Sequence, residues 1–130
     1  ADLDFYKSIG LGYRADFFKG LAQIVTPEYI TELSLCDGCE LKKRLLAVRG
    51  IGDKVADCVR LFGFYKTDSF PVDVWIEKIY AEDFGGTEKN REKISRYFTD
   101  TFKSDSGYFQ QYLFHYKRNL EKTLSGGSAQ

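Results

Sequence analysis

Two groups that could take part in covalent chemistry occur at the starts of two predicted helices. Lys54 follows the turn Gly50–Gly52 and lies in the first turn of a helix that continues as an apolar run to Phe64. A lysine is unfavourably placed there, because this end of a helix dipole favours anions. Asp73 follows Pro71 and begins the next apolar helical pattern, which makes it a predicted N-cap or first-turn residue. The two helix starts thus offer one amine and one carboxylate.

The turn before Lys54 predicts a hairpin between two helices. An apolar helix expected over residues 40–48 enters the turn, and a second helix begins directly after it. Gly50 and Gly52 can adopt the positive φ angles of so tight a turn without a steric penalty. Backbone N–H groups at the second helix start point outward and could bind a phosphate. From these residues alone, a plain phosphate contact is favoured for Lys54 over a nucleophilic role.

The last predicted helix, over residues 108–124, carries a second candidate site. Gln110 and Phe114 are four residues apart and should project from one face, as should Lys54 and Cys58 on the hairpin helix. An amide beside an aromatic ring suits a nucleobase pocket, because the amide can hydrogen-bond to the base edge while the ring stacks on the base. The spacing is not specific by itself, since an aromatic residue on a helix more often belongs to the core.

A glycine-rich loop near the start of the chain carries an aromatic residue and an arginine side by side. Tyr13 and Arg14 follow Gly10 and Gly12 and precede a helix predicted over residues 15–24. An aromatic ring at such a loop tip could wedge between bases, and the arginine could hydrogen-bond to a base edge. The alternative is a tyrosine packed on its own helix beside a solvated arginine.

Taken together, these segments resemble the 8-oxoguanine DNA glycosylases of the helix-hairpin-helix superfamily. The resemblance rests on the hairpin pattern Gly-ψ-Gly-x-Lys-x-Ala, on the strings Lys-Val-Ala-Asp-Cys and Pro-Val-Asp-Val, and on the segments 10–15 and 107–114. It covers nearly the whole chain but only the second half of such an enzyme. The partner it implies is double-stranded DNA containing an oxidised guanine, and the N-terminal portion that family members carry is expected to be needed for activity.

The resemblance implies catalytic roles for Lys54 and Asp73. In that family the lysine displaces the oxidised base at the sugar and forms a Schiff base, the aspartate assists, and β-elimination then nicks the strand. The resemblance further implies that Cys58, Gln110 and Phe114 line the base pocket. Together these roles predict a bifunctional DNA N-glycosylase and AP lyase.

Further residues are implied to contact the DNA. Tyr13 would fill the gap left by the extruded base, and Arg14 would contact the orphaned cytosine. Gly50 and Gly52 would allow close approach of the backbone to a phosphate. Trp75 stands where the best-known members have a histidine, and its indole N–H could still donate one hydrogen bond.

No organic cofactor is expected, but the resemblance implies a monovalent cation at the hairpin. The backbone carbonyls of Leu46, Val48 and Ile51 would hold it, and it would bridge to a DNA phosphate. Cys36 and Cys39 lack a second cysteine pair, and the chain has a single histidine, so a closed zinc site is not expected.

Composition predicts one all-α domain, a helical bundle over residues 1–124, followed by a flexible tail over 125–130. Nineteen basic and nineteen acidic side chains cancel, so no net positive charge indicates a nucleic-acid partner. Helix N-termini can nevertheless bind phosphate without net charge. Three cysteines, with no signal peptide and no long apolar run, favour a soluble intracellular protein, in the cytoplasm of a prokaryote or in a nucleus.

The remaining pattern predicts an exposed, charged helix over residues 88–102 that begins at Thr87. The last helix is expected to bury one apolar stripe, made by Tyr108, Tyr112, Leu113, Tyr116 and Leu120.

Three other interpretations compete with the enzyme. One is a non-catalytic helix-hairpin-helix DNA-binding module in which Lys54 is only a cation. The second is a glycosylase of different base specificity, and the third is a purely structural helical bundle. A binding module has no need of Asp73, Gln110 or Phe114, so the full set of residues favours the enzyme.

Overall fold

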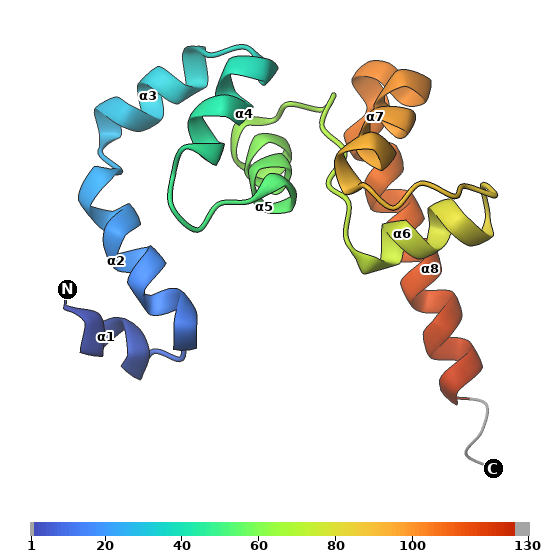
Figure 1. Ribbon diagram of the computed structural model, residues 1–130, viewed down its shortest axis with the longest axis horizontal. Helices are drawn as coiled ribbons and strands as arrows, with labels where there is room; N and C mark the ends of the chain where they lie inside the picture. Colours follow the sequence, from blue (N-terminus) through green and yellow to red (C-terminus); the bar gives the residue numbers. More distant parts are fainter. Residues whose placement is uncertain (1, 127–130) are drawn as a thin grey trace. The chain divides into compact units, whose positions relative to one another are not determined.

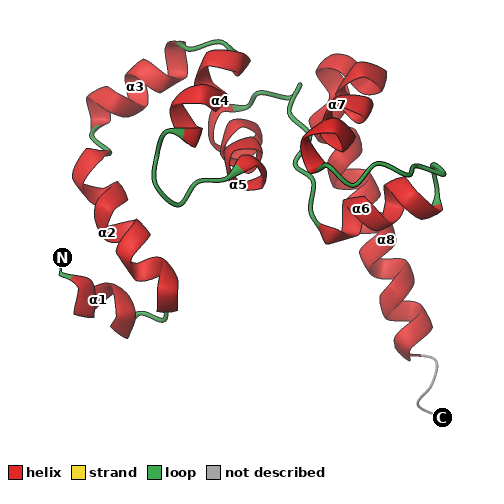
Figure 2. Cartoon of the chain, in the orientation of Figure 1, coloured by secondary structure: helices red, strands yellow, loops and turns green. Residues whose placement is uncertain are grey.

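The computed structural model describes residues 2–126, and every regular element within that range is a helix (Figures 1 and 2). The predicted all-helical fold class is therefore confirmed. The chain is divided into two compact units, one ending at Gly52 and the other beginning at Asp53. None of the described helices combines the length and the apolar character that crossing a bilayer requires. Of the expected tail, residues 127–130 lie outside the described range.

The first unit consists of short helices whose starts are marked by capping side chains. Its elements are α1 (Leu3–Ser8), the 3-10 helix η1 (Gly12–Arg14), α2 (Ala15–Ile24), α3 (Pro27–Leu35) and α4 (Gly38–Leu46). The predicted bounds of α2 are confirmed, and the Thr26 hydroxyl accepts a hydrogen bond from the Tyr29 N–H at 3.1 Å to cap α3. Helix α4 begins two residues earlier than predicted, because the Asp37 carboxylate accepts from the Glu40 N–H at 2.8 Å.

The second unit contains all the remaining elements. They are α5 (Asp53–Cys58), the π-helical turn η2 (Val59–Gly63), α6 (Val74–Glu82), α7 (Arg91–Phe102), the 3-10 helix η3 (Lys103–Asp105) and α8 (Ser106–Gly126). Helix α8 continues to Gly126, into the segment that composition predicts to be a tail.

An aromatic and aliphatic core holds the second unit together. It comprises Phe70, Val72, Ile76, Ile79, Ile94 and Phe98. The rings of Phe70 and Phe98 stack with centroids 4.4 Å apart, and both side chains are fully buried. Leu113 and Phe114 of α8 pack against this core from a third helix. The segment before α6 is therefore fixed by burial of Phe70 and Val72, and this positions the first residue of α6.

The predicted start of α7 at Glu88 is wrong. The Glu88 carboxylate accepts hydrogen bonds from the N–H groups of Lys89 and Asn90, at 2.8 and 2.9 Å, and so holds these residues in a turn. Asn90 then caps the helix by accepting from the Lys93 N–H at 3.1 Å. A local side-chain contact thus competes with the helix and delays its start by three residues.

The predicted buried stripe of α8 is also wrong in most of its members. Tyr108, Tyr112, Tyr116 and Leu120 are exposed, and Tyr112 retains 76% of its accessible surface. The buried face of the helix instead carries small and polar residues: Ser106, Gly107, Gln110 and Lys117. Leu46 at the end of α4 likewise remains 39% exposed.

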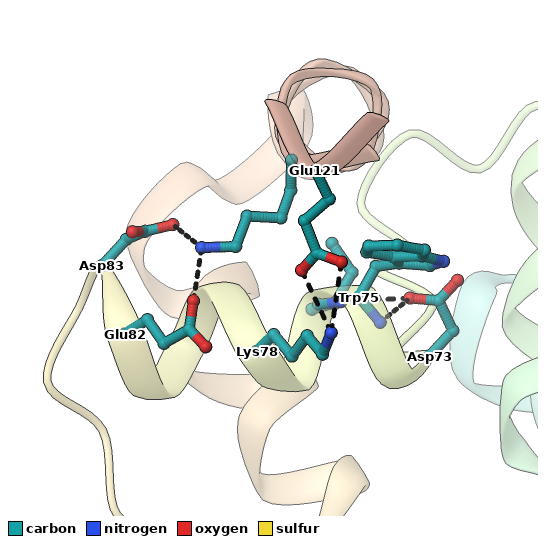
Figure 3. A network of polar contacts seen from close by, with 8 residues as sticks. Asp73, Trp75, Lys78, Glu82, Asp83 and Glu121 are labelled. Atoms are coloured by element: carbon teal, nitrogen blue, oxygen red, sulfur yellow. Dashed lines mark hydrogen bonds and ion pairs between the residues drawn. The ribbon is translucent and has the colours of Figure 1, made fainter. Parts of the chain in front are cut away.

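Ion pairs join α8 to α6 within the second unit (Figure 3). The nearly buried Lys117 ammonium lies 2.6 Å from Glu82 and 3.3 Å from Asp83, at the end of α6. Lys78 lies 3.0 Å from Glu121. The hydrogen bond between Lys117 and Glu82 raises the pKa of Lys117 and lowers that of Glu82. Both ends of α6 are therefore held in place, because Asp73 caps its start.

We expect Phe98→Ala to lower the free energy of unfolding by about 3–5 kcal/mol, because it opens a cavity in the aromatic core. Tyr97→Ala removes a neighbouring ring that is 43% exposed and should cost about 1 kcal/mol or less. Urea unfolding followed by circular dichroism measures both. Equal losses for the two variants would contradict the assignment of Phe98 to the core.

Candidate active site

A small cavity in the second unit lies among side chains from α5, η2, the start of α6 and α8. Its volume is about 200 Å³, below the range of about 300–1,000 Å³ that is usual for drug-sized ligands. The residues that line it are Lys54, Cys58, Phe62, Pro71, Asp73, Gln110, Gln111 and Phe114. The structure thus brings together the five residues that the resemblance assigns to catalysis and to the base pocket.

Asp73 is the N-cap of α6, as predicted. Its Oδ1 atom accepts hydrogen bonds from the N–H groups of Trp75 and Ile76, each at 3.0 Å. These two bonds hold the carboxylate at the helix start, where the helix dipole favours negative charge. Both bonds involve the same oxygen. A carboxylate oriented in this way can stabilise positive charge that develops beside it.

Gln110 is 95% buried, and its amide is already engaged on both sides. Its Nε2 atom donates to the Pro71 carbonyl at 3.1 Å, and its Oε1 atom accepts from the Gln111 amide at 2.5 Å. These bonds fix which end of the amide is donor and which is acceptor. One N–H and one oxygen lone pair remain for a ligand, so an oriented donor and acceptor are available beside the cavity.

Phe114 is half-buried and offers an aromatic surface to the same cavity. The guanidinium of Arg118, one turn further along α8, lies 5.5 Å from the centre of the Phe114 ring. This distance is within the range of a cation–π contact. The ring is therefore packed against the core, covered in part by a cation, and accessible from the cavity.

Lys54 and Cys58 face the cavity from one side of α5, one helical turn apart. Lys54 is solvent-exposed and Cys58 is half-buried. Burial raises the pKa of the Cys58 thiol, the Lys54 ammonium acts to lower it, and the carboxylates of Asp57 and Asp73 act to raise it. The Cys58 thiol thus interacts electrostatically with both Lys54 and Asp73, and all three side chains line the same cavity.

Three lining residues were not predicted from the sequence: Phe62, Pro71 and Gln111. Phe62 lies four residues after Cys58 and eight after Lys54, so helical spacing on its own could have indicated it. Gln111 adjoins Gln110 and donates to it, a contact that depends on rotamers and leaves no sequence signal.

The turn that leads into α5 needs glycine at one of its two predicted positions. Gly50 has φ +92°, and a Cβ atom there would lie 2.6 Å from the ring of Phe17. Gly52 has no positive φ, and an added Cβ would meet nothing within 4 Å. The conformational argument therefore holds for Gly50 and is wrong for Gly52. The packing of the two hairpin helices on one another stays a prediction.

Tyr13 and Arg14 lie in η1 of the first unit. Tyr13 is 75% exposed, and the guanidinium of Arg14 lies over its ring at 4.6 Å from the centre. An exposed ring at a loop tip is free to contact a ligand, and the ring is not packed on its own helix. Their proposed contacts with DNA stay predictions.

Trp75 lies in the first turn of α6, and its ring is contacted by the Lys78 ammonium at 5.0 Å from the ring centre. The cavity is not lined by Trp75. Its predicted contact with DNA therefore concerns the neighbourhood of Asp73 rather than the cavity itself.

The hairpin carbonyls proposed to hold a cation belong to the first unit. The Val48 carbonyl accepts a hydrogen bond from the Ile51 N–H at 3.1 Å, which closes the turn. A carbonyl oxygen keeps a second lone pair, so this bond is compatible with cation binding. Among the described residues no cluster of three or more histidine, cysteine or acidic side chains could hold a metal ion. The cation at Leu46, Val48 and Ile51 stays a prediction.

The chain is similar to known proteins both in sequence and in structure. No family model matches the chain. A probable N-glycosylase/DNA lyase of Methanothermobacter thermautotrophicus is 35% identical over 113 residues, which are 86% of this chain and 36% of the relative. The N-glycosylase/DNA lyase OGG1 of Arabidopsis thaliana is 26% identical, over 92% of this chain and 36% of the relative.

Solved structures give the same result. The 8-oxoguanine glycosylase/lyase of Clostridium acetobutylicum, in complex with double-stranded DNA containing cytosine opposite 8-oxoG, matches with a TM-score of 0.81 and 29% identity. The match covers 93% of this chain and 42% of that one. All three similar proteins are DNA N-glycosylases with lyase activity, by name. Over most of its length the chain is similar to N-glycosylase/DNA lyases, and the solved structure among them is an 8-oxoguanine glycosylase/lyase; the chain spans less than half the length of each of these relatives.

We expect Lys54→Gln to slow the alkylation of Cys58 several-fold at a pH just above neutrality. Loss of the lysine charge removes the interaction that lowers the pKa of the thiol, so less thiolate is present to react. Iodoacetamide labelling followed by peptide mass spectrometry gives the rate, with the exposed Cys39 as internal reference. An unchanged ratio of the Cys58 and Cys39 rates would contradict the proximity of Lys54 and Cys58.

The two roles of Asp73 can be separated by substitution. Asp73→Asn keeps an N-cap acceptor and should change the free energy of unfolding little, whereas Asp73→Ala should lower it by about 0.5–2 kcal/mol. Thermal unfolding of both variants measures the difference. An equally large loss of unfolding free energy in Asp73→Asn and Asp73→Ala would contradict stabilisation of the helix by the hydrogen bonds of the cap.

Proposed function

We propose that the chain forms the catalytic part of a bifunctional DNA glycosylase and AP lyase that removes 8-oxoguanine from duplex DNA. The observation that carries this proposal is the convergence of Lys54, Asp73, Gln110 and Phe114 on one small cavity. The names of the similar proteins support the same reaction class. A module that only binds DNA would need the lysine but neither the oriented carboxylate nor the amide and ring opposite it.

Substrate binding begins with extrusion of the damaged nucleotide, because a stacked base cannot be reached at its sugar. Extrusion costs a few kcal/mol, which insertion of the exposed Tyr13 ring into the duplex would offset in part. The extruded base stacks on Phe114, and the free N–H and lone pair of Gln110 hydrogen-bond to its edge. Arg14 contacts the base left without a partner.

Base excision follows from attack by the uncharged Lys54 amine on C1′ of the sugar. The nitrogen–C1′ bond forms as the bond from C1′ to the base breaks, and the base leaves with the electron pair. Asp73 stabilises the positive charge that develops on the sugar and accepts a proton from the attacking amine. The departing base takes up a proton and is released.

Strand cleavage proceeds from the covalent intermediate. The ring oxygen of the sugar leaves C1′ and is protonated, and the nitrogen lone pair forms the Schiff base. The Schiff base acidifies the C2′ protons, so that loss of one of them expels the 3′ phosphate by β-elimination. Water then hydrolyses the imine and frees Lys54.

The proposed partner and place of action follow from this substrate. Oxidised duplex DNA is the partner, with hairpin N–H groups and Gly50 near a phosphate and Trp75 beside the start of α6. We infer that the protein acts where the genome lies, in the cytoplasm of a prokaryote or in a nucleus. Because the relatives are more than twice as long as the matched part, we also infer that further residues of the enzyme complete the DNA contacts.

The proposal predicts a covalent adduct on borohydride reduction. The complete enzyme, with this chain and the further residues inferred above, is incubated with an 8-oxoguanine duplex, reduced and analysed by denaturing electrophoresis. We expect an adduct that disappears in Lys54→Gln and persists in Lys89→Gln, which removes an exposed lysine of the same unit. Asp73→Asn should reduce its rate of formation by at least about 100-fold while the fold is kept. An adduct that survives Lys54→Gln, or none with the complete parent enzyme, would contradict the proposal.

The same assay tests base specificity. Gln110→Ala should lower the adduct yield with 8-oxoguanine DNA far more than with a duplex carrying an abasic site, because only the former needs base recognition. Equal effects on both substrates would instead favour a glycosylase of different specificity.

A further inference from the structure

Arg60, which lies in η2 directly after α5, is a buried arginine. Arg60 retains only 9% of its accessible surface, and its Nη1 atom lies 2.9 Å from Oδ1 of Asp57, which is 97% buried. The two residues are three positions apart and lie on either side of the junction between α5 and η2. Arg60 Nη2 lies 3.7 Å from Asp68, a residue of the segment that follows the helix.

This ion pair is incompletely satisfied. Among the described residues the Arg60 Nε atom is a buried donor without a hydrogen-bond partner. Burial of two charges carries a large desolvation cost, which is offset only when all their hydrogen-bonding groups are paired. Stability alone therefore does not account for a charged pair here, since apolar residues of similar volume would serve the core equally well.

The same two residues hold the segment that leads to Asp73. Ser69 donates from its hydroxyl to the Asp57 carbonyl at 3.0 Å, and the Lys66 N–H donates to the Arg60 carbonyl at 2.9 Å. Asp68 lies between these two anchored positions and faces the guanidinium. Asp57 and Arg60 thus contact the segment through their backbone carbonyls, and Arg60 also contacts it through its side chain.

Other contacts fix the far side of this segment. The Gly107 N–H donates to the Thr67 carbonyl at 2.7 Å, Ser95 to the Phe70 carbonyl at 2.8 Å, and Gln110 to the Pro71 carbonyl at 3.1 Å. These bonds come from α7 and α8. The hydrogen bonds and the ion pair of Asp57 and Arg60 connect the segment to the helix that carries Lys54.

We propose that the Asp57–Arg60 pair is a positioning device for catalysis. It holds the Lys54-bearing helix at a fixed separation from segment 66–71, and therefore from Asp73, which follows that segment. The inference rests on the proposed function for its catalytic meaning, but the separation that it fixes is a property of the folded chain. Neither residue lines the cavity, so both act through Lys54 and Asp73 and not on the substrate.

The test compares the parent chain with the double variant Asp57→Asn/Arg60→Met. Removing both charges together avoids a lone buried charge, so the variant should fold with a melting temperature close to that of the parent. Amide hydrogen exchange by NMR is the first measurement. We expect exchange at Ser69, Trp75 and Ile76 to accelerate by at least about tenfold relative to that at Phe98, whose N–H group lies within helix α7.

The second measurement is the rate of borohydride-trapped adduct formation at saturating 8-oxoguanine DNA. Displacement of the amine from its attack geometry should lower this rate by at least about tenfold, while the DNA concentration for half-maximal rate stays unchanged. Arg60→Lys, which keeps a cation beside Asp57, should recover part of the rate. Lys117→Met is the matched control, because it removes a nearly buried cation from the opposite end of α6 (Figure 3). It should leave both measurements at parent values.

Two results would overturn the positioning role, and a third concerns only the proposed function. Parent-like exchange at Ser69, Trp75 and Ile76 in the double variant would overturn the positioning role, whatever the adduct assay gives. Accelerated exchange with an undiminished adduct rate would also overturn it, since the separation would then not matter for catalysis. If the complete parent enzyme forms no adduct, the proposed function fails, and the exchange measurement still decides whether the pair fixes the separation.

Discussion

The candidate site depends on the cap that Asp73 forms at the start of α6. Two backbone N–H groups that have no partner within the helix bind one oxygen of its carboxylate. The same contact that begins the helix therefore also orients an acidic group toward a cavity. Such a group needs no loop to hold it, because its position is determined by the helix backbone. Lys54 lies in the first turn of α5, and its side chain is exposed.

Burial fixes the remaining side of the cavity. Phe70 and Val72 are inserted into the aromatic core, and Pro71 between them presents its carbonyl to Gln110. The amide of Gln110 is thus hydrogen-bonded to the same segment that precedes Asp73. A shift of this segment would alter the carboxylate and the base-reading amide together. This coupling explains how a cavity built from three separate parts of the chain can keep one geometry.

The elements that sequence predicts well are those with a local cause. Asp73 was identifiable as a cap because its side chain acts within three residues. The start of α7 was misplaced because Glu88 has a local contact of its own, which competes with Thr87 as a helix start. The buried face of α8 was misjudged since it depends on tertiary partners: polar groups find buried partners there, while tyrosines stay exposed. The convergence of Gln110 and Lys54 was accessible only through the resemblance.

The position of Trp75 has a spectroscopic consequence. It is the single tryptophan among nine tyrosines and eleven phenylalanines, so excitation at the red edge of the protein absorption band selects one indole. Its own backbone N–H is bound by the Asp73 carboxylate, and a lysine ammonium lies over its ring. Emission from this indole therefore reports on the start of α6 without any label. The molecule therefore carries an intrinsic fluorophore in the first turn of the helix that Asp73 caps.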